Sequence, residues 1–338
     1  MALQGTGTEL DPFLITNLLE LRTEITDANA YYKVTQDLDV RGTQYETEWS
    51  ECTIACLQLD FNNKKLRNLK CKDLQHMFLL DCDTTTIKNA KFENVENKWA
   101  LFGHTSGRYD YILNLTILDS QFSIKWNAIN TDFINTKPYA LLGTENTNVD
   151  RCVFNLSIFG TTTCIINSKL NVNRCHFILN GDYTIKPTVY SNDAGATVSG
   201  FAFFKLKNIG NSLYVTGNLT VTQDFSETRD FYVFLNSRNT VLSRYENKAH
   251  FAECYFAVDL TVNALPGTDK KFDMWRYQTT TQTSAPPCSW MSIGSMIVNN
   301  GKLTSLPNSY AKVYIVTKEQ SKNLGFLQSI GFPVYSKE

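Results

Sequence analysis

The polar side chains that could do acid–base chemistry are few, and most of them stand alone. A six-residue pattern recurs along the chain, and its third position is occupied in turn by Asn89, Asp119, Arg151, Arg174 and Glu253. If the copies stack as strands of one sheet, equivalent positions lie about 4.8 Å apart. Hydrolysis of a glycosidic bond needs two carboxyl groups roughly 5 to 10 Å apart. Because this column mixes amides, carboxylates and guanidinium groups, it predicts an ion pair between Asp119 and Arg151 and no catalytic residues.

The histidines and cysteines do not form a metal-binding pattern. The four histidines are scattered at positions 76, 104, 176 and 250, and the repeat places His176 on an outward position, which predicts a surface histidine. The nine cysteines include no Cys-x-x-Cys pair and no zinc-like spacing. We therefore expect reduced, buried thiols that act as small hydrophobic groups, with no metal and no cofactor.

One segment combines aromatic residues with an arginine and is a candidate binding loop. Within residues 266–290, the side chains that would contact a partner are Phe272, Trp275, Arg276, Tyr277 and Trp290. Aromatic residues beside an arginine are typical of interface anchors and of sugar-stacking surfaces. The other interpretation stays open, namely a loop folded onto the flank of the molecule with its aromatic residues buried.

Charge and hydropathy exclude several classes of partner. The chain has 32 basic and 33 acidic residues, and its net charge is -1. The densest basic run, residues 64–72, is interrupted by Leu66 and Leu69, so binding to nucleic acid has little support. No stretch approaches the roughly 18 apolar residues that span a bilayer, and the N-terminus shows no secretory signal. We therefore expect a chain that folds in a cytoplasm and inserts into no membrane.

The recurring pattern is the main architectural signal. It reads apolar, two variable residues, small, one variable residue, then Phe, with copies at residues 87–92, 117–122, 149–154, 172–177 and 251–256. The long interval before the last copy leaves room for degenerate copies, for example near residues 213–221. A repeat of this length is typical of solenoids, whose coils bury their apolar faces only by stacking.

The spacing inside the pattern indicates a corner between two short strands. The small residue and the Phe are two positions apart and share one face of a strand. The leading apolar residue breaks that alternation, which a bend of the chain would restore. Stacked copies then form a parallel β-helix with an internal column of small residues, Ala90, Ser120, Cys152, Cys175 and Cys254. A second internal column is aromatic and consists of Phe92, Phe122, Phe154, Phe177 and Phe256.

Both ends of the chain are predicted to cap this helix. Residues 17–27 predict a short amphipathic helix and residues 31–35 a strand. Residues 311–316 predict a strand, followed by a helix that Thr317 would N-cap and that ends near Ser329, before Gly331. The expected organisation is an N-terminal cap at residues 1–50, a β-helix at 51–305, and a small strand–helix–strand cap at 306–338.

Several segments, in order, resemble β-helix proteins of the GLUG type. Residues 5–9 and 11–15 are similar to the family's Gly-x-Gly-Thr and Asp-Pro-Tyr-x-Ile opening, and residues 31–39 to its Tyr-Tyr-x-Leu-x-x-Asp-Ile-Asp strand. Residues 59–69 are similar to Asp-Gly-Asn-x-x-x-Ile-x-Asn-Leu. Residues 100–103, Ala-Leu-Phe-Gly, match Gly-Leu-Phe-Gly except for the first residue. The end of the chain, residues 317–320 and 327–334, resembles a cap on such modules in bacteriophage virion proteins.

The resemblance implies an all-β, right-handed parallel β-helix and a non-enzymatic virion protein of a bacteriophage. It would be a fibre, a spike, or a component attached to a capsid or tail, assembled in the host cytoplasm. Its partners would be other virion proteins, host-surface polysaccharide, and two further copies in a trimer. Two alternatives stay open: a polysaccharide lyase or glycoside hydrolase on the same scaffold, as in tailspikes, and a bacterial surface adhesin.

Overall fold

The structure is a computed structural model that describes most of the N-terminal half and selected strands of the rest. The described residues are 3–71, 76–97, 100–104, 114–128, 146–161, 166–185, 204–206, 211–223, 231–236, 251–263, 272–276, 312–315 and 323–333. Nearly all of the secondary structure among them is β-strand, with two short helices, α1 (Leu18–Thr23) and α3 (Leu324–Ser329).

The strands form three sheets, and within each sheet neighbouring strands are hydrogen-bonded in the following order. The ten-stranded sheet is β1 (Phe13–Ile15), β2 (Tyr31–Val34), β5 (Gln58–Asp60), β8 (Thr84–Lys88), β11 (Asn114–Leu118), β13 (Asn146–Asp150), β15 (Ile166–Asn173), β17 (Phe204–Leu206), β19 (Phe231–Asn236) and β21 (Phe272–Arg276). The nine-stranded sheet is β3 (Leu38–Asp39), β6 (Lys65–Arg67), β9 (Lys91–Asn97), β12 (Gln121–Ala128), β14 (Val153–Thr161), β16 (Cys175–Ile185), β18 (Asn211–Gln223), β20 (Phe251–Asn263) and β22 (Lys312–Ile315). The three-stranded sheet is β4 (Cys52–Ile54), β7 (His76–Leu80) and β10 (Ala100–His104).

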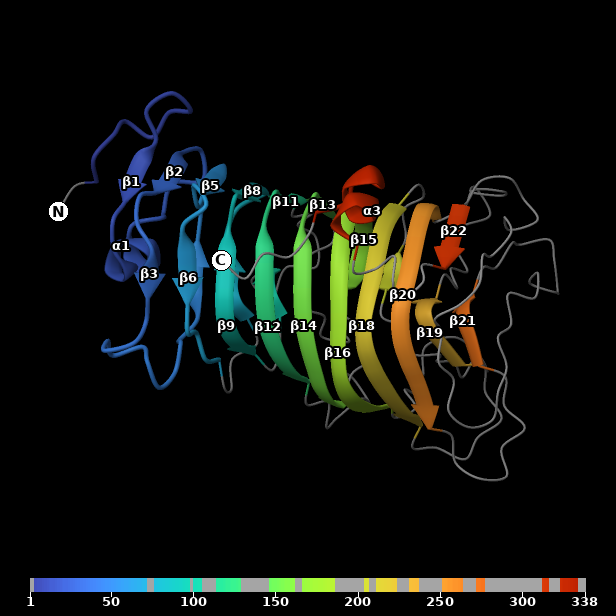
Figure 1. Ribbon diagram of the computed structural model, residues 1–338. Coiled ribbons are helices and arrows are strands. Elements are labelled where there is room, and N and C mark those ends of the chain that lie inside the picture. The colour runs from blue at the N-terminus through green and yellow to red at the C-terminus, as the bar shows by residue number, and fades with distance from the viewer. Residues whose placement is uncertain are drawn as a thin grey trace, which may run out of the picture.

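The chain coils, and successive coils add parallel strands to the same sheets. Strands β5, β6 and β7 follow one another in sequence yet belong to three different sheets, and each pairs in parallel with the equivalent strand of the next coil. Figure 1 shows the long strands of the nine-stranded sheet side by side along the molecule, in the order β9, β12, β14, β16, β18 and β20. The protein is therefore an all-β, all-parallel coiled fold. Strands β1 to β3 already belong to the two large sheets, so the chain from Phe13 to Asp39 contributes to the stack.

The corner that the repeat predicts is present in its first four copies. The third residue of the pattern separates the two strands and has a positive φ in each of these copies: 53° at Asn89, 48° at Asp119, 51° at Arg151 and 48° at Arg174. This left-handed conformation turns the chain and restores the inward alternation. The fifth copy has no such corner, because its leading Phe251 already lies in β20 and the register shifts opposite it.

The register aligns the repeat's phenylalanines in one column inside the coils, in the order Phe92, Phe122, Phe154 and Phe177. Adjacent rings along the last three lie with centroids 5.0 Å apart. The next coil carries Val215 at this position, and Phe256 follows it in β20. One degenerate coil, the one that contains β18, therefore separates the fourth and fifth copies.

The small-residue column lies beside the aromatic one. Ala90, Ser120, Cys152 and Cys175 are all buried, and each thiol of this column donates to a main-chain carbonyl of the coil before it: Cys152 to Ile117 and Cys175 to Val149, at 3.5 and 3.4 Å. Leu213 takes this place in the β18 coil, and Cys254 follows it in register.

Helix α1 lies near the N-terminal end of the stack (Figure 1). Asn17 is the N-cap and accepts from the backbone N–H of Glu20 at 2.9 Å, while the Glu20 carboxylate accepts from the backbone N–H and hydroxyl of Thr16. Leu21 and Ile25 are buried against the first coils. The helix ends at Thr23, earlier than the amphipathic pattern predicts, because the chain turns at Glu24 to bring Ile25 inward.

The C-terminal segment lies on the side of the coiled stack as far as it is described. Strand β22 extends the nine-stranded sheet beyond β20. Helix α3 begins after Asn323, whose side chain accepts from the backbone N–H of Phe326 at 3.1 Å, and it ends before Gly331, whose φ is 72°. The expected N-cap, Thr317, lies outside the described residues. Residues 331–333 then pack against β16 and β18, and Figure 1 shows α3 over the side of the strands near β15 and β16.

Candidate functional site

The predicted binding residues fall on the last strand of the ten-stranded sheet. Phe272, Trp275 and Arg276 lie in β21, which is a strand and not the loop that the sequence suggests. The strand pairs in parallel with β19, so that Leu235 is in register with Trp275. The aromatic-rich run forms a strand because it adds the next parallel strand to the ten-stranded sheet, beside β19. The other two candidates, Tyr277 and Trp290, lie outside the described residues.

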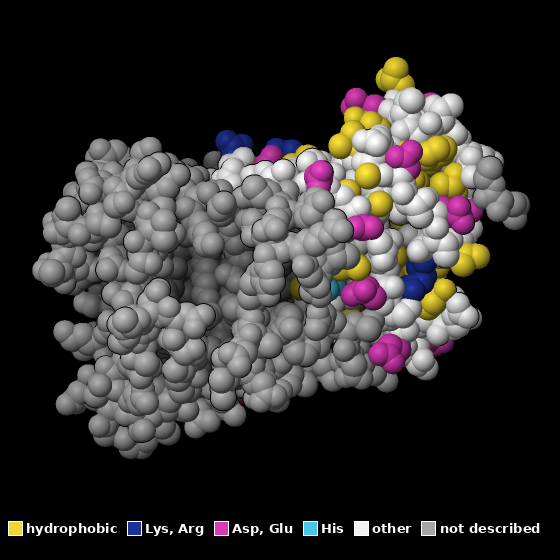
Figure 2. Space-filling model, turned by 180° about the vertical axis from the view of Figure 1, so that it is seen from behind, with side chains coloured by type: hydrophobic (Ala, Val, Ile, Leu, Met, Phe, Trp, Pro, Cys, Tyr) yellow, Lys and Arg dark blue, Asp and Glu magenta, His cyan; other side chains and the backbone are white. Residues whose placement is uncertain are grey.

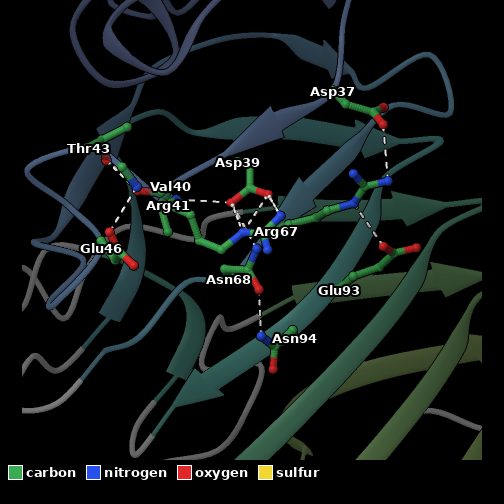
Figure 3. Close-up of polar contacts among 11 residues, drawn as sticks. Asp37, Asp39, Val40, Arg41, Thr43, Glu46, Arg67, Asn68, Glu93 and Asn94 are labelled. Carbon is green, nitrogen blue, oxygen red and sulfur yellow. Dashed lines mark hydrogen bonds and ion pairs between the residues drawn. The ribbon is translucent and has the colours of Figure 1, made fainter.

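A charged network crosses the first coils on the outer face of the nine-stranded sheet. Arg67 lies between two carboxylates from neighbouring coils, with nitrogen–oxygen distances of 3.1 Å to Asp37 and 3.0 Å to Glu93 (Figure 3). Lys65 adds a second ion pair to Glu93 at 2.9 Å, and its backbone N–H donates to Asp37 at 2.9 Å. Each coil is therefore joined to the next by opposite charges outside as well as by apolar side chains inside.

A second polar ladder runs beside this network and involves asparagines in left-handed conformations. The Asn68 amide donates to Asp39 at 2.8 Å, and the Asn94 amide donates to the Asn68 side-chain oxygen at 2.5 Å (Figure 3). Asn68 and Asn94 have φ values of 65° and 54°, which asparagine tolerates better than most residues. The Arg41 guanidinium beside Asp39 holds the pKa of that carboxyl well below its usual range, so it remains an acceptor.

The predicted ion pair at the corner is present and is bidentate. Arg151 donates to both carboxylate oxygens of Asp119, at 2.7 and 2.8 Å, and also contacts Asp150. The Asp150 carboxylate in turn accepts from the Asn173 amide of the next coil at 2.8 Å. Hydrogen bonding to Asp119 raises the pKa of Arg151, so the guanidinium stays charged and supplies no acid–base group. Both partners are nearly half exposed, at 47% and 44%, and such a pair adds at most about 1 kcal/mol.

The prediction of a surface histidine at position 176 is wrong. His176 does point outward from β16, but the C-terminal segment covers it and leaves it 5% exposed. Its Nδ1 donates to the carbonyl of Pro333 at 3.2 Å, and its Nε2 accepts from the Thr216 hydroxyl at 2.9 Å. The ring also stacks on Tyr214 with centroids 4.6 Å apart. Burial lowers the pKa of His176 to about 4, so the ring is neutral near pH 7.

Of the six cysteines whose side chains the structure describes, all but one are buried. Cys52, Cys56, Cys71, Cys152 and Cys175 are buried, whereas Cys82 is half-buried. Burial raises the pKa of Cys52 to about 12, and it also raises the pKa values of Cys56 and Cys175. Thiols of this kind stay protonated and pack as apolar groups. No cluster of three or more potential metal ligands occurs among the described residues.

The described part of the face seen in Figure 2 shows no large patch of one charge. Figure 2, the view from behind, shows acidic side chains dispersed among polar atoms, with Lys and Arg occurring here and there. Within the described part of the chain, no helix is long and apolar enough to cross a membrane.

The charged network of the first coils is the part of this surface that sequence reasoning missed. Its members alternate along each strand, as in Lys65 and Arg67, and this period of two was the available signal. Their partners, however, come from coils 26 and more residues away, and pairing them requires the register.

Comparison with known proteins assigns no family. No protein-family description matches the sequence. No curated protein matches it either. Among solved structures, a protein from Bacteroides ovatus that is provisionally named an immunoglobulin A1 protease aligns with 97% of this chain and 90% of its own, at 12% identity and a TM-score of 0.41. A similarity this low says nothing about activity.

Proposed function

We propose that this chain is a right-handed parallel β-helix of the GLUG type and serves as a non-enzymatic structural or attachment protein of a bacteriophage virion. It would form part of a fibre or spike, or decorate a capsid or tail. Its role would be mechanical: the protein would form a stiff rod and present binding surfaces at defined positions along it.

The observation that supports this proposal is that charged side chains of neighbouring coils form ion pairs with one another. Arg67 joins Asp37 and Glu93 across three consecutive coils, and Arg151 joins Asp119 on the coil before it. Side chains held in ion pairs between coils resist bending and sliding of the stack. They are poorly suited to catalysis, because an acid catalyst needs a carboxyl group that keeps its proton near neutral pH. The carboxylates that lie near one another among the described residues share an arginine, Asp37 with Glu93 at Arg67 and Asp119 with Asp150 at Arg151, which favours a structural use over the enzyme alternative.

Attachment would use the last coils. The candidate surface is β21 with the residues that follow it, namely Phe272, Trp275, Arg276, Tyr277 and Trp290. Its partners would be host-surface polysaccharide or another virion protein. Three copies packed side by side would bury apolar groups left outside the coils, which is a common solution for rods of this kind.

The direct test of the virion assignment is the composition of purified particles. Phage particles would be purified from a culture whose phage genome encodes this chain, digested and measured by quantitative mass spectrometry, with antibody labelling by electron microscopy. The proposal expects the chain at a fixed copy number per particle, in multiples of three, and labelling at one position on the virion. A chain that is abundant in the lysate but absent from purified particles would contradict it.

A further inference from the structure

Two cysteines of successive coils meet at the corner between the three-stranded and the ten-stranded sheets. Strands β4 and β7 are paired in parallel through Ile54 and Leu80, and the backbone N–H of Asp81 continues the ladder by donating to the carbonyl of Ile54 at 2.9 Å. Cys56 and Cys82 each lie two residues beyond that last pair, in corners of different length, because the next paired residues are Gln58 and Thr86. The sheet register therefore does not align the two cysteines, and their proximity rests on the contact of the Cys82 side chain with the Cys56 main chain.

The side chain of Cys82 is directed at the Cys56 main chain. Its Sγ lies 3.5 Å from the Cys56 carbonyl oxygen, and it also contacts the Thr85 hydroxyl, which donates to the same carbonyl at 2.8 Å. The two cysteines therefore share one hydrogen-bonding centre. They also differ in access, because Cys56 is fully buried whereas Cys82 is half-buried.

We propose that Cys56 and Cys82, which are thiols in the resting protein, form a disulfide when the folded chain reacts with a small disulfide oxidant. This bond would join the coil that contains β4 to the coil that contains β7. The Cys82 thiolate attacks one sulfur of the oxidant, forms a mixed disulfide and releases one thiol. The Cys56 sulfur then attacks Cys82 and releases the second thiol. Two protein thiols lose two electrons, the oxidant disulfide gains them, and the two protons pass to the released thiols.

The surroundings of Cys82 select the kind of oxidant. Asp81 and Asp83 flank it in sequence, and both are exposed. Two carboxylates repel an anionic disulfide such as oxidised glutathione and attract a cationic one such as cystamine. The first step is therefore faster with cystamine. The second step is slower than the first, because burial raises the pKa of Cys56 and leaves little of its thiolate.

The aligned pair Cys152 and Cys175 provides an internal comparison. Cys175 is in register with Cys152, since their neighbours Val153 and His176 are partners in the sheet. Both of these thiols are fully buried and donate to main-chain carbonyls of other coils. Neither thiol has the partial solvent exposure of Cys82, so an oxidant does not reach them while the chain is folded.

The test is to incubate the folded full-length protein with cystamine, block the remaining thiols and map the peptides by mass spectrometry. We expect a transient cysteamine adduct on Cys82, followed by a Cys56–Cys82 crosslink. Closing a loop between residues 26 positions apart should raise the Tm by roughly 5 °C. Oxidised glutathione at the same concentration should react at least several-fold more slowly.

Matched variants separate this chemistry from a change in folding. Cys56→Ser should stop the reaction at the Cys82 adduct, Cys82→Ser should abolish both adduct and crosslink, and Cys175→Ser should leave the crosslink unchanged. A wild-type protein whose Cys82 adduct persists without forming the crosslink would overturn the proposal, as would a Cys82 that stays unmodified in the folded chain. The crosslink depends on the contact between Cys82 and the Cys56 main chain, and it is independent of the virion assignment.

Discussion

Acidification should release the C-terminal segment from the side of the coiled stack, because His176 is held neutral beneath it. The pKa of His176 is about 4 while the segment covers the ring, whereas the ordinary pKa of histidine is 6.5. Once the segment lifts, water reaches the ring, and His176 takes up a proton below about pH 6.5. The covered ring does not do so until about pH 4. The stabilisation of the covered state is therefore complete above pH 6.5 and is lost as the pH falls toward 4.

The size of this effect follows from the difference between the two pKa values. The difference between a pKa of 6.5 and one of about 4 corresponds to about 3 kcal/mol once the pH has fallen below both values. At pH 5 the loss is about 2 kcal/mol, which raises the open population about 30-fold relative to pH 7.5. The described partners of the ring do not oppose the change, because the Pro333 carbonyl, the Thr216 hydroxyl and the Tyr214 ring carry no compensating negative charge at these pH values.

Hydrogen exchange followed by mass spectrometry would measure the opening on a peptide that covers residues 323–333. Protection factors, corrected for the intrinsic pH dependence of exchange, should fall about 30-fold between pH 7.5 and pH 5. The variant His176→Phe keeps an aromatic ring but does not titrate, so its protection should change little over the same range. Equal protection of the wild type at both pH values, or an equal fall in the variant, would refute the reasoning.

Three further predictions concern the stack itself. Phe154→Ala removes a ring that stacks at 5.0 Å on both neighbours and should lower the free energy of unfolding by about 3 to 5 kcal/mol, measured by urea denaturation. A double-mutant cycle of Asp119→Ala and Arg151→Ala should give a coupling below about 1 kcal/mol that shrinks in salt, and a coupling of several kcal/mol would contradict the exposed geometry. Arg174→Asn should raise stability by about 0.5 to 1 kcal/mol, because asparagine tolerates a φ of 48° better than arginine does, and a lower Tm would count against the corner assignment.

The corners and columns were predictable because a short local pattern encodes them. A small residue two positions before a Phe, preceded by an apolar residue at an odd spacing, defines both the inward face and the bend. The degenerate copy expected near residues 213–221 is present as one coil, in which Leu213 and Val215 hold the column positions without resembling the pattern. The corner was not predictable at the fifth copy, because Phe251 has the residue type of the leading position but already lies inside a strand.

The outer surface was less predictable because its contacts depend on distant segments. The burial of His176 requires a residue 157 positions further along the chain. The ion pairs of Arg67 depend on coil lengths, which no local pattern reveals. The residues of β21 suggest a loop because an aromatic run with an arginine fits both a loop and a strand, and only the parallel pairing with β19 distinguishes them.

The most direct test of the central claim is an assay of the purified protein on polysaccharides from candidate host cells that records binding and cleavage together. Binding would be followed by sedimentation with the polysaccharide, and cleavage by new reducing ends and by unsaturated products. We expect binding without either product, and we expect Trp275→Ala and Tyr277→Ala to weaken the binding. New reducing ends or unsaturated sugars that appear in proportion to the protein concentration would contradict the non-enzymatic assignment.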